Sequence, residues 1–212
     1  MNDTSFSRFL ALCRSIACER AQEVLLRNLG RYLAEHHQDD AALIIQDNAQ
    51  ERVAMAIELF AKCESPIEQI IASVLPFCND GYKEIGYSWL PEPEFGSVIY
   101  SQEEIGGYRL DFLIKCFCNG FVRMVAVECD GHDYHDRTKE QAARDKARDR
   151  KLASLGITVL RFTGSEIYRR PYQIQEEIEA ILLHAIEDAM ADAGTGPRRV
   201  HLVTSPAQER AV

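Results

Sequence analysis

Three acidic residues stand in or directly after apolar stretches, where burial would normally exclude a charge. Asp111 interrupts the apolar run of residues 110–114, and Glu128 follows the sequence Val-Ala-Val. A buried carboxylate without a partner is costly, so these side chains need compensation. Asp130 lies two residues beyond Glu128 and shares its strand face, and antiparallel pairing can bring Asp111 near both. Because three converging carboxylates repel one another, and because oxygen ligands favour Mg²⁺ or Mn²⁺ over Zn²⁺, we expect one of these two cations to bind there.

The two acid-bearing segments are expected to pair as one β-hairpin. Asn119-Gly120 supplies the residues that most readily adopt the positive φ angles of a type I′ turn, and apolar or β-branched residues flank it. The segments 85–89 and 98–100 are expected to join this hairpin in an antiparallel unit. A further strand at 157–162 should run parallel to its neighbour, because it is reached through a helix. Apolar periodicity predicts helices over residues 5–35 and 41–61, from Ser65 onward, over 137–155 and over 174–186.

Five segments together resemble the PD-(D/E)xK nuclease superfamily, and more closely its small branch related to very-short-patch-repair endonucleases. They are SPIEQ at 65–69, LDF at 110–112, AVECDGHDYH at 126–135, ARDKARDRKLASLG at 143–156 and VLRF at 159–162. Two positions depart from the superfamily pattern. Leu110 replaces a proline that only shapes the turn, and Asp130 replaces the lysine, whose role is left vacant.

The resemblance implies an α/β fold with a restriction-endonuclease-like core, in which a helix, three mainly antiparallel strands, a helix and a strand follow in that order. It also implies metal-dependent phosphodiester hydrolysis. Asp111 and Glu128 would bind the cation, the Cys129 carbonyl would complete its coordination, and Asp130 would bind or orient the attacking water. With no lysine, His132, Arg148 or Arg161 would stabilise the transition state.

His132 and His135 follow the acids at a spacing of three residues. Two solvated loop histidines would be the ordinary interpretation, but their position next to the carboxylates favours a proton relay. His132 is the better candidate and His135 the second. A zinc hydrolase that uses both histidines is a weaker alternative, because a third nitrogen or sulfur ligand is not evident.

Two interpretations of Glu68 are open. Ser65 at the cap, Pro66 at the first helical position and Glu68 three residues after the cap match a capping box. The resembled family, in contrast, places a glutamate on a helix before its core sheet, directed at the metal site. We expect the two roles to be difficult to combine in one side chain.

The segment 137–155 is a helix former with seven basic and three acidic residues in a chain of net charge −9. A solvated helix with internal charge pairs would explain it. Its place beside the acids favours contact with backbone phosphates instead, which need lysine or arginine and no particular base. The expected nucleic-acid contacts are Lys139, Arg144, Arg148 and Arg161, and Arg148 could also point inward at the acids.

The composition of the 212 residues, 46% hydrophobic and 27% charged, is that of a globular protein. No apolar run suits a membrane helix and no signal segment is evident, so we expect a cytoplasmic location without membrane contact. Seven cysteines without a CxxC pair indicate reduced thiols.

We expect a helical N-terminal region (1–62) that packs or contacts a partner or a second copy, a nuclease domain (63–190) and a flexible tail (191–212). The predicted function is cleavage of nucleic acid, with DNA favoured. The alternative is a catalytically inactive module on the same fold that binds nucleic acid or a partner protein.

Overall fold

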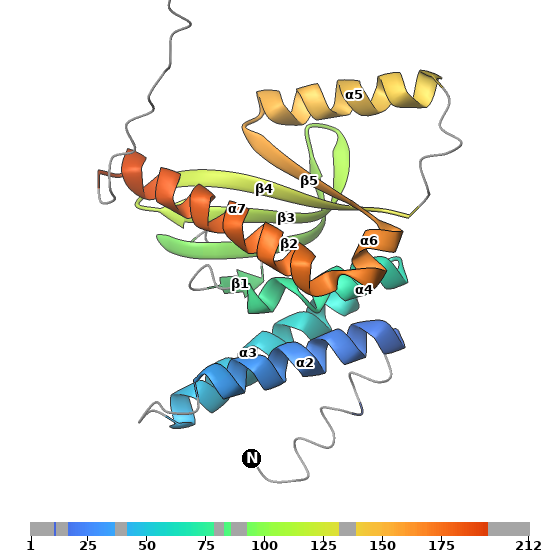
Figure 1. Cartoon of the computed structure of the whole chain (residues 1–212). Helices are drawn as coiled ribbons and strands as arrows, with labels where there is room; N and C mark the ends of the chain where they lie inside the picture. The colour runs from blue at the N-terminus through green and yellow to red at the C-terminus, as the bar shows by residue number, and fades with distance from the viewer. Residues whose placement is uncertain are drawn as a thin grey trace, which may run out of the picture.

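The computed structural model describes residues 11, 17–36, 42–78, 83–85, 93–131 and 139–194. These residues form a five-stranded mixed sheet whose strands lie side by side in chain order, with helices on both faces (Figure 1). The predicted fold class, a restriction-endonuclease-like α/β core with a helical N-terminal region, is confirmed. The acids Asp111, Glu128 and Asp130 all lie on strands of this sheet.

Three long strands form the antiparallel centre of the sheet: β2 (Phe95–Ile105), β3 (Tyr108–Cys118) and β4 (Phe121–Asp130). The edge strands are β1 (Lys83–Ile85), parallel to β2, and β5 (Ile157–Thr163), parallel to β4. The parallel direction of β5 is as predicted. Of the predicted strand 85–89, only Ile85 is described, as the last residue of β1, and residues 86–89 lie outside the described residues. Because β1 runs parallel to β2, the expected all-antiparallel unit is wrong at this edge of the sheet.

β2 extends well beyond the predicted segment 98–100. Its second half is polar and gives no apolar signal, yet Glu103 pairs with Leu110 and Glu104 pairs with Arg109 on β3. The pairing partner therefore decides the length of this strand. The turn between β3 and β4 is as predicted, because Asn119 and Gly120 have φ angles of 48° and 82°, the positive values that a type I′ turn requires.

The helices, in chain order, are α2 (Glu19–Glu35), α3 (Ala42–Phe60), α4 (Pro66–Ala72), the short 3₁₀ helix η1 (Leu75–Phe77), α5 (Lys139–Ser154), α6 (Gly164–Arg169) and α7 (Pro171–Asp192). The single helix predicted over 5–35 is wrong at Cys18, which has extended backbone angles and forms the N-cap of α2. The Cys18 thiol accepts from the Ala21 N–H, and the Cys18 N–H donates to Gln69 Oε1 at 2.6 Å. The cap therefore ties α2 to α4.

The sheet separates two hydrophobic cores. One core includes Ile114 and Val125 of the sheet and packs against α2, α3, α4 and α7. The other includes Leu113 and Ala126 and packs against Leu152 of α5. Figure 1 shows α7 crossing one side of the sheet while α5 lies on the other. The acid-bearing strands β3 and β4 therefore pass between two layers of helices.

The N-terminal helices and the sheet share one core, since buried residues of α2 and α3 such as Leu25 and Leu59 belong to the same cluster as Phe112. The domain division at residue 62 stays a prediction, and most of the predicted tail lies outside the described residues. Within the part of the chain that the structure describes, no helix combines the length and apolar character needed to cross a membrane.

Candidate active site

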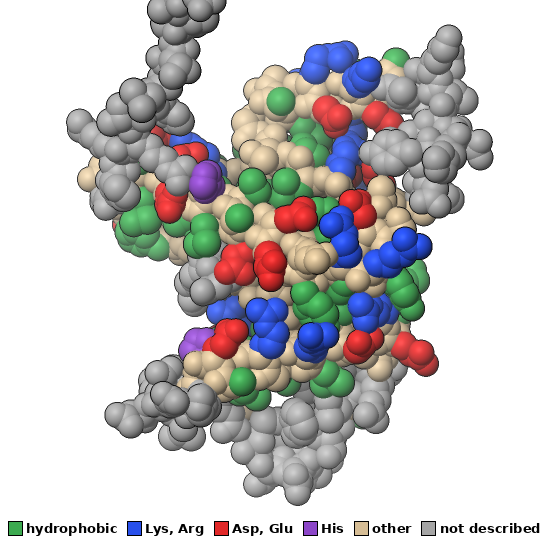
Figure 2. All heavy atoms as spheres, in the orientation of Figure 1, with side chains coloured by type: hydrophobic (Ala, Val, Ile, Leu, Met, Phe, Trp, Pro, Cys, Tyr) green, Lys and Arg blue, Asp and Glu red, His purple; other side chains and the backbone are tan. Residues whose placement is uncertain are grey.

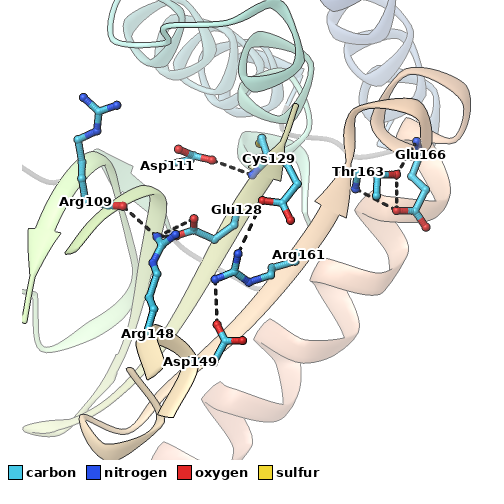
Figure 3. A network of polar contacts seen from close by, with 10 residues as sticks. Arg109, Asp111, Glu128, Cys129, Arg148, Asp149, Arg161, Thr163 and Glu166 are labelled. Atoms are coloured by element: carbon cyan, nitrogen blue, oxygen red, sulfur yellow. Dashed lines mark hydrogen bonds and ion pairs between the residues drawn. The ribbon is translucent and has the colours of Figure 1, made fainter. Parts of the chain in front are cut away.

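Asp111 and Glu128 lie side by side on neighbouring strands. Phe112 pairs with Val127 across β3 and β4, so Asp111 and Glu128 occupy the next position away from the turn. The Asp111 carboxylate accepts a hydrogen bond from the backbone N–H of Cys129, with 2.7 Å between Cys129 N and Asp111 Oδ2 (Figure 3). The Asp111 carboxylate gives the Cys129 N–H a hydrogen-bond partner just beyond the last backbone pair of β3 and β4. This bond holds the carboxylate against β4.

Both acids have a raised pKa. Burial is the main reason that the pKa of Asp111 is raised; the Cys129 N–H works against the rise, and the negative charge of Glu68 adds to it. Burial is also the main cause for Glu128, where Arg148 lowers the pKa and the charge of Asp111 raises it. Each carboxylate therefore keeps its negative charge at a free-energy cost, and additional positive charge between them would be favourable.

Arg148 of α5 is the counter-ion of Glu128. The Glu128 side chain is 5% exposed, and Arg148 Nη2 lies 2.7 Å from each of its carboxylate oxygens. The same nitrogen donates to the carbonyl of Arg109 at 3.0 Å, and the guanidinium lies 5.8 Å from the ring centroid of Tyr108. Arg148 thus points inward at the acids.

Arg161 occupies the position on β5 that pairs with Glu128. Its Nη2 donates to Asp149 Oδ1 at 2.8 Å, and its Nη1 lies 3.7 Å from Asp130 Oδ1. Asp130 stands where the superfamily pattern has lysine. An arginine from the neighbouring strand is therefore placed next to that position.

Glu68 of α4 makes the contacts of a helix cap, and its negative charge also acts on Asp111. Ser65 Oγ accepts from the Glu68 N–H at 3.3 Å and donates to Glu68 Oε1 at 2.6 Å, as a helix cap does. Oε2 accepts from the Glu64 N–H and from Gln102 Nε2, both at 2.9 Å. At the same time the carboxylate is near enough to raise the pKa of Asp111. Oε1 thus bonds Ser65 while Oε2 bonds Glu64 and Gln102, and a role of Glu68 in a metal site stays a prediction.

The remaining predicted residues are His132, His135, Lys139 and Arg144. His132 and His135 lie outside the described residues, and of Lys139 only the helical backbone is described. Arg144 is exposed on α5, with other exposed cations at Lys146, Arg150 and Lys151. Figure 2 shows lysine and arginine side chains along this helix. The predicted roles of the two histidines, Lys139 and Arg144 stay predictions.

Sequence reasoning missed two contributors to this site. Gln102 holds Glu68, and Arg109 forms a bidentate pair with Glu64 at 2.8 and 2.6 Å. No local pattern marks Gln102, which stands in a polar stretch of β2. Arg109 directly precedes the LDF motif, so its nearness to the site was the available signal.

Among the residues that the structure describes, the polar contacts around Asp111 and Glu128 join more acids than cations. The acids are Glu64, Glu68, Asp111, Glu128, Asp130 and Asp149, and the cations are Arg109, Arg148 and Arg161. The group thus carries a formal excess of negative charge when all members are ionised. Among the residues with described placement, no three His, Cys, Asp or Glu side chains are gathered as a ready metal-binding cluster.

Residues 93–182 match the family model REase_MTES_1575, a restriction endonuclease-like family. The matched segment is less than half of the chain and includes Asp111, Glu128, Asp130, Arg148 and Arg161, while Glu68 lies before it. The match supports the superfamily level of the resemblance and a nuclease-like function, without extending to the very-short-patch-repair branch. No curated protein and no solved structure matches the chain.

Proposed function

We propose that this protein is a Mg²⁺- or Mn²⁺-dependent nuclease that hydrolyses phosphodiester bonds in nucleic acid, with DNA as the favoured substrate. The observation that carries the proposal is the pair of acids Asp111 and Glu128, adjacent on two strands and both with a raised pKa. A fold that served packing alone would gain from replacing these carboxylates by apolar side chains. The match to a restriction endonuclease-like family supports the same conclusion.

The residues fit a divalent cation by donor type and by charge. Asp111 and Glu128 would hold it through carboxylate oxygens, which Mg²⁺ and Mn²⁺ prefer, and Asp130 and the Cys129 carbonyl are the further candidates. The excess of acids over arginines in the group leaves negative charge that a divalent ion would neutralise. The chemistry that a bound cation supplies here is polarisation of the scissile phosphate and a lower pKa for the attacking water.

The arginines would act on the phosphate. Arg148 lies beside Glu128 with a fifth of its side chain exposed. Arg161 is held near Asp130 by Asp149. These side chains would stabilise the charge of the transition state, the role that the absent lysine leaves open. The exposed cations of α5 would bind backbone phosphates farther from the reaction, and His132 stays the candidate for proton transfer.

A catalytically inactive binding module on the same fold is the second candidate. The observation that favours it is that both carboxylate oxygens of Glu128 already bond Arg148. In such a protein the pair would serve the fold, and α5 would bind nucleic acid without cleavage.

The experiment is cleavage of supercoiled plasmid and of single-stranded DNA and RNA by the purified protein with Mg²⁺, Mn²⁺, Zn²⁺ or EDTA. Glu128→Gln keeps the size of the side chain and a partner for Arg148 while it removes the charge. The matched control is Glu177→Gln at an exposed position of α7. Cleavage that requires Mg²⁺ or Mn²⁺, is lost in Glu128→Gln and is kept in Glu177→Gln establishes the nuclease. DNA binding without cleavage under every condition establishes the binding module instead.

A further inference from the structure

Gln102 of β2 has an unusual backbone at the position that faces Asp111. Ser101 pairs with Phe112 and Glu103 pairs with Leu110, so Gln102 and Asp111 are opposite each other between these pairs. The φ angle of Gln102 is 57°, in the left-handed region, where residues other than glycine and asparagine are rare. Such backbone strain persists where the surrounding structure enforces it, and it gathers at functional sites.

The alternation of side chains on β3 is also irregular at this point. In a regular strand, residues 110 and 112 would share a face. Here Phe112 belongs to the core under α7, while Leu110 belongs with Leu113 to the core under α5. The alternation of faces therefore shifts at Asp111, opposite Gln102. This shift accompanies the unusual direction of the Asp111 carboxylate, which lies against the Cys129 N–H of the next strand.

The side chain of Gln102 makes a directed contact with Glu68. Gln102 Nε2 lies 2.9 Å from Glu68 Oε2. Since a carboxylate only accepts hydrogen bonds, the orientation of the amide is fixed, with Nε2 toward Glu68. The opposite atom, Gln102 Oε1, is buried and has no hydrogen-bond partner in the described structure. A buried acceptor without a partner costs free energy. The Gln102 amide therefore keeps its hydrogen bond to Glu68 although its own oxygen has no partner.

We infer that Gln102 is a positioning residue of the proposed nuclease site: its strained backbone directs the amide at Glu68 and so holds this carboxylate beside Asp111. This inference rests on the proposed function. The other contacts of Glu68 come from Glu64 and Ser65, which precede it on its own segment, whereas Gln102 joins it to the strand next to Asp111. Gln102 thereby fixes the distance between the helix acid and the sheet acids.

The test compares Gln102→Gly with Gln102→Ala. Both variants remove the amide, but glycine accepts the positive φ angle and alanine does not. If the amide positions Glu68, both variants should bind Mn²⁺ about tenfold more weakly by calorimetry, the effect typical of lost outer-sphere partners. Their melting temperatures should differ, with Gln102→Gly melting a few degrees above Gln102→Ala. High Mn²⁺ should restore most of kcat, and KM for DNA should stay unchanged.

The control is Gln173→Ala, at an exposed glutamine of α7. If Gln102→Gly binds Mn²⁺ as tightly as the wild type and Gln102→Ala does not, only the backbone angle matters and the inference is overturned. Wild-type Mn²⁺ affinity in both variants would also overturn it. Wild-type protein that neither binds Mn²⁺ nor cleaves would instead refute the proposed function, and the inference that depends on it would fall for that separate reason.

Discussion

The ion pair between Arg148 and Glu128 gives the sharpest test of the electrostatics of this site. We consider Arg148→Met, which keeps an unbranched chain next to Tyr108 and removes the charge. The Glu128 side chain is 5% exposed, and Arg148 Nη2 lies 2.7 Å from its Oε1. Removing one partner of a buried pair leaves the other charge uncompensated and typically costs about 3–5 kcal/mol. Because a fifth of the Arg148 side chain is exposed, we expect about 3 kcal/mol at neutral pH.

The loss should depend on pH in a definite direction. Burial raises the pKa of Glu128 above its unfolded value, which is about 4.3, and Arg148 limits that rise. An acid with a raised pKa in the folded state lowers stability as pH increases from the unfolded value through the folded one, because the folded state binds more protons in that window. Without Arg148 the folded pKa rises further. The variant and the wild type should therefore differ little near pH 4.3 and most at neutral pH.

The assay is urea unfolding followed by far-ultraviolet circular dichroism at pH 4.5, 6 and 7.5, with Glu128→Gln and the double variant beside Arg148→Met. At neutral pH a loss of about 3 kcal/mol corresponds to a fall in melting temperature of about 6–12 °C for a chain of this size. Glu128→Gln should restore most of the stability of Arg148→Met, because no buried charge is left. Equal losses at pH 4.5 and 7.5, or no recovery in the double variant, would refute this account of the pair.

Three further predictions concern other parts of the fold. Gly106→Ala should be destabilised by about 1 kcal/mol more than Gly107→Ala in urea unfolding, because both glycines have positive φ but an added Cβ at Gly106 would lie 2.8 Å from a leucine methyl group; equal losses would contradict this. Cys63 and Cys129 should react slowly with iodoacetamide at pH 8 in the folded protein, because burial raises the pKa of both thiols, and fast native labelling by mass spectrometry would argue against this. Thr163→Ala should lower stability by about 1 kcal/mol through loss of the capping box of α6, and an unchanged urea midpoint would exclude that contribution.

Local signals in the sequence predicted the centre of the fold. Asn119-Gly120 specifies its turn through backbone preference alone, and the acids Asp111 and Glu128 are conspicuous because their neighbours are apolar. Such signals do not depend on distant residues. Apolar periodicity also located most of the helices, because it is a property of short segments, whereas the order of the core elements was implied by the family resemblance.

Features that depend on long-range contacts were harder to predict. The role of Glu68 could not be decided from its capping spacing, because its contact with Gln102 joins residues 34 positions apart. The positive φ angle of Gln102 has no signal, since glutamine is not a residue that prefers it. The inward direction of Arg148, in contrast, had a usable sequence signal, because Leu152 follows it at a spacing of four. Leu152 is buried, so Arg148 lies on the buried face of α5.

The hairpin that carries Asp111 and Glu128 also bears on the order of events in folding. Its strands are joined by a two-residue turn, and such hairpins form in about 1–10 μs because loop closure is short. The two acids can thus meet while both are still hydrated. They lose that hydration when α4 and α5, which come from either side of the hairpin in sequence, dock on the sheet. The free-energy cost of burying the two charges therefore arises late in folding. Neutralising Glu128 should accordingly change the rate of unfolding more than the rate of folding.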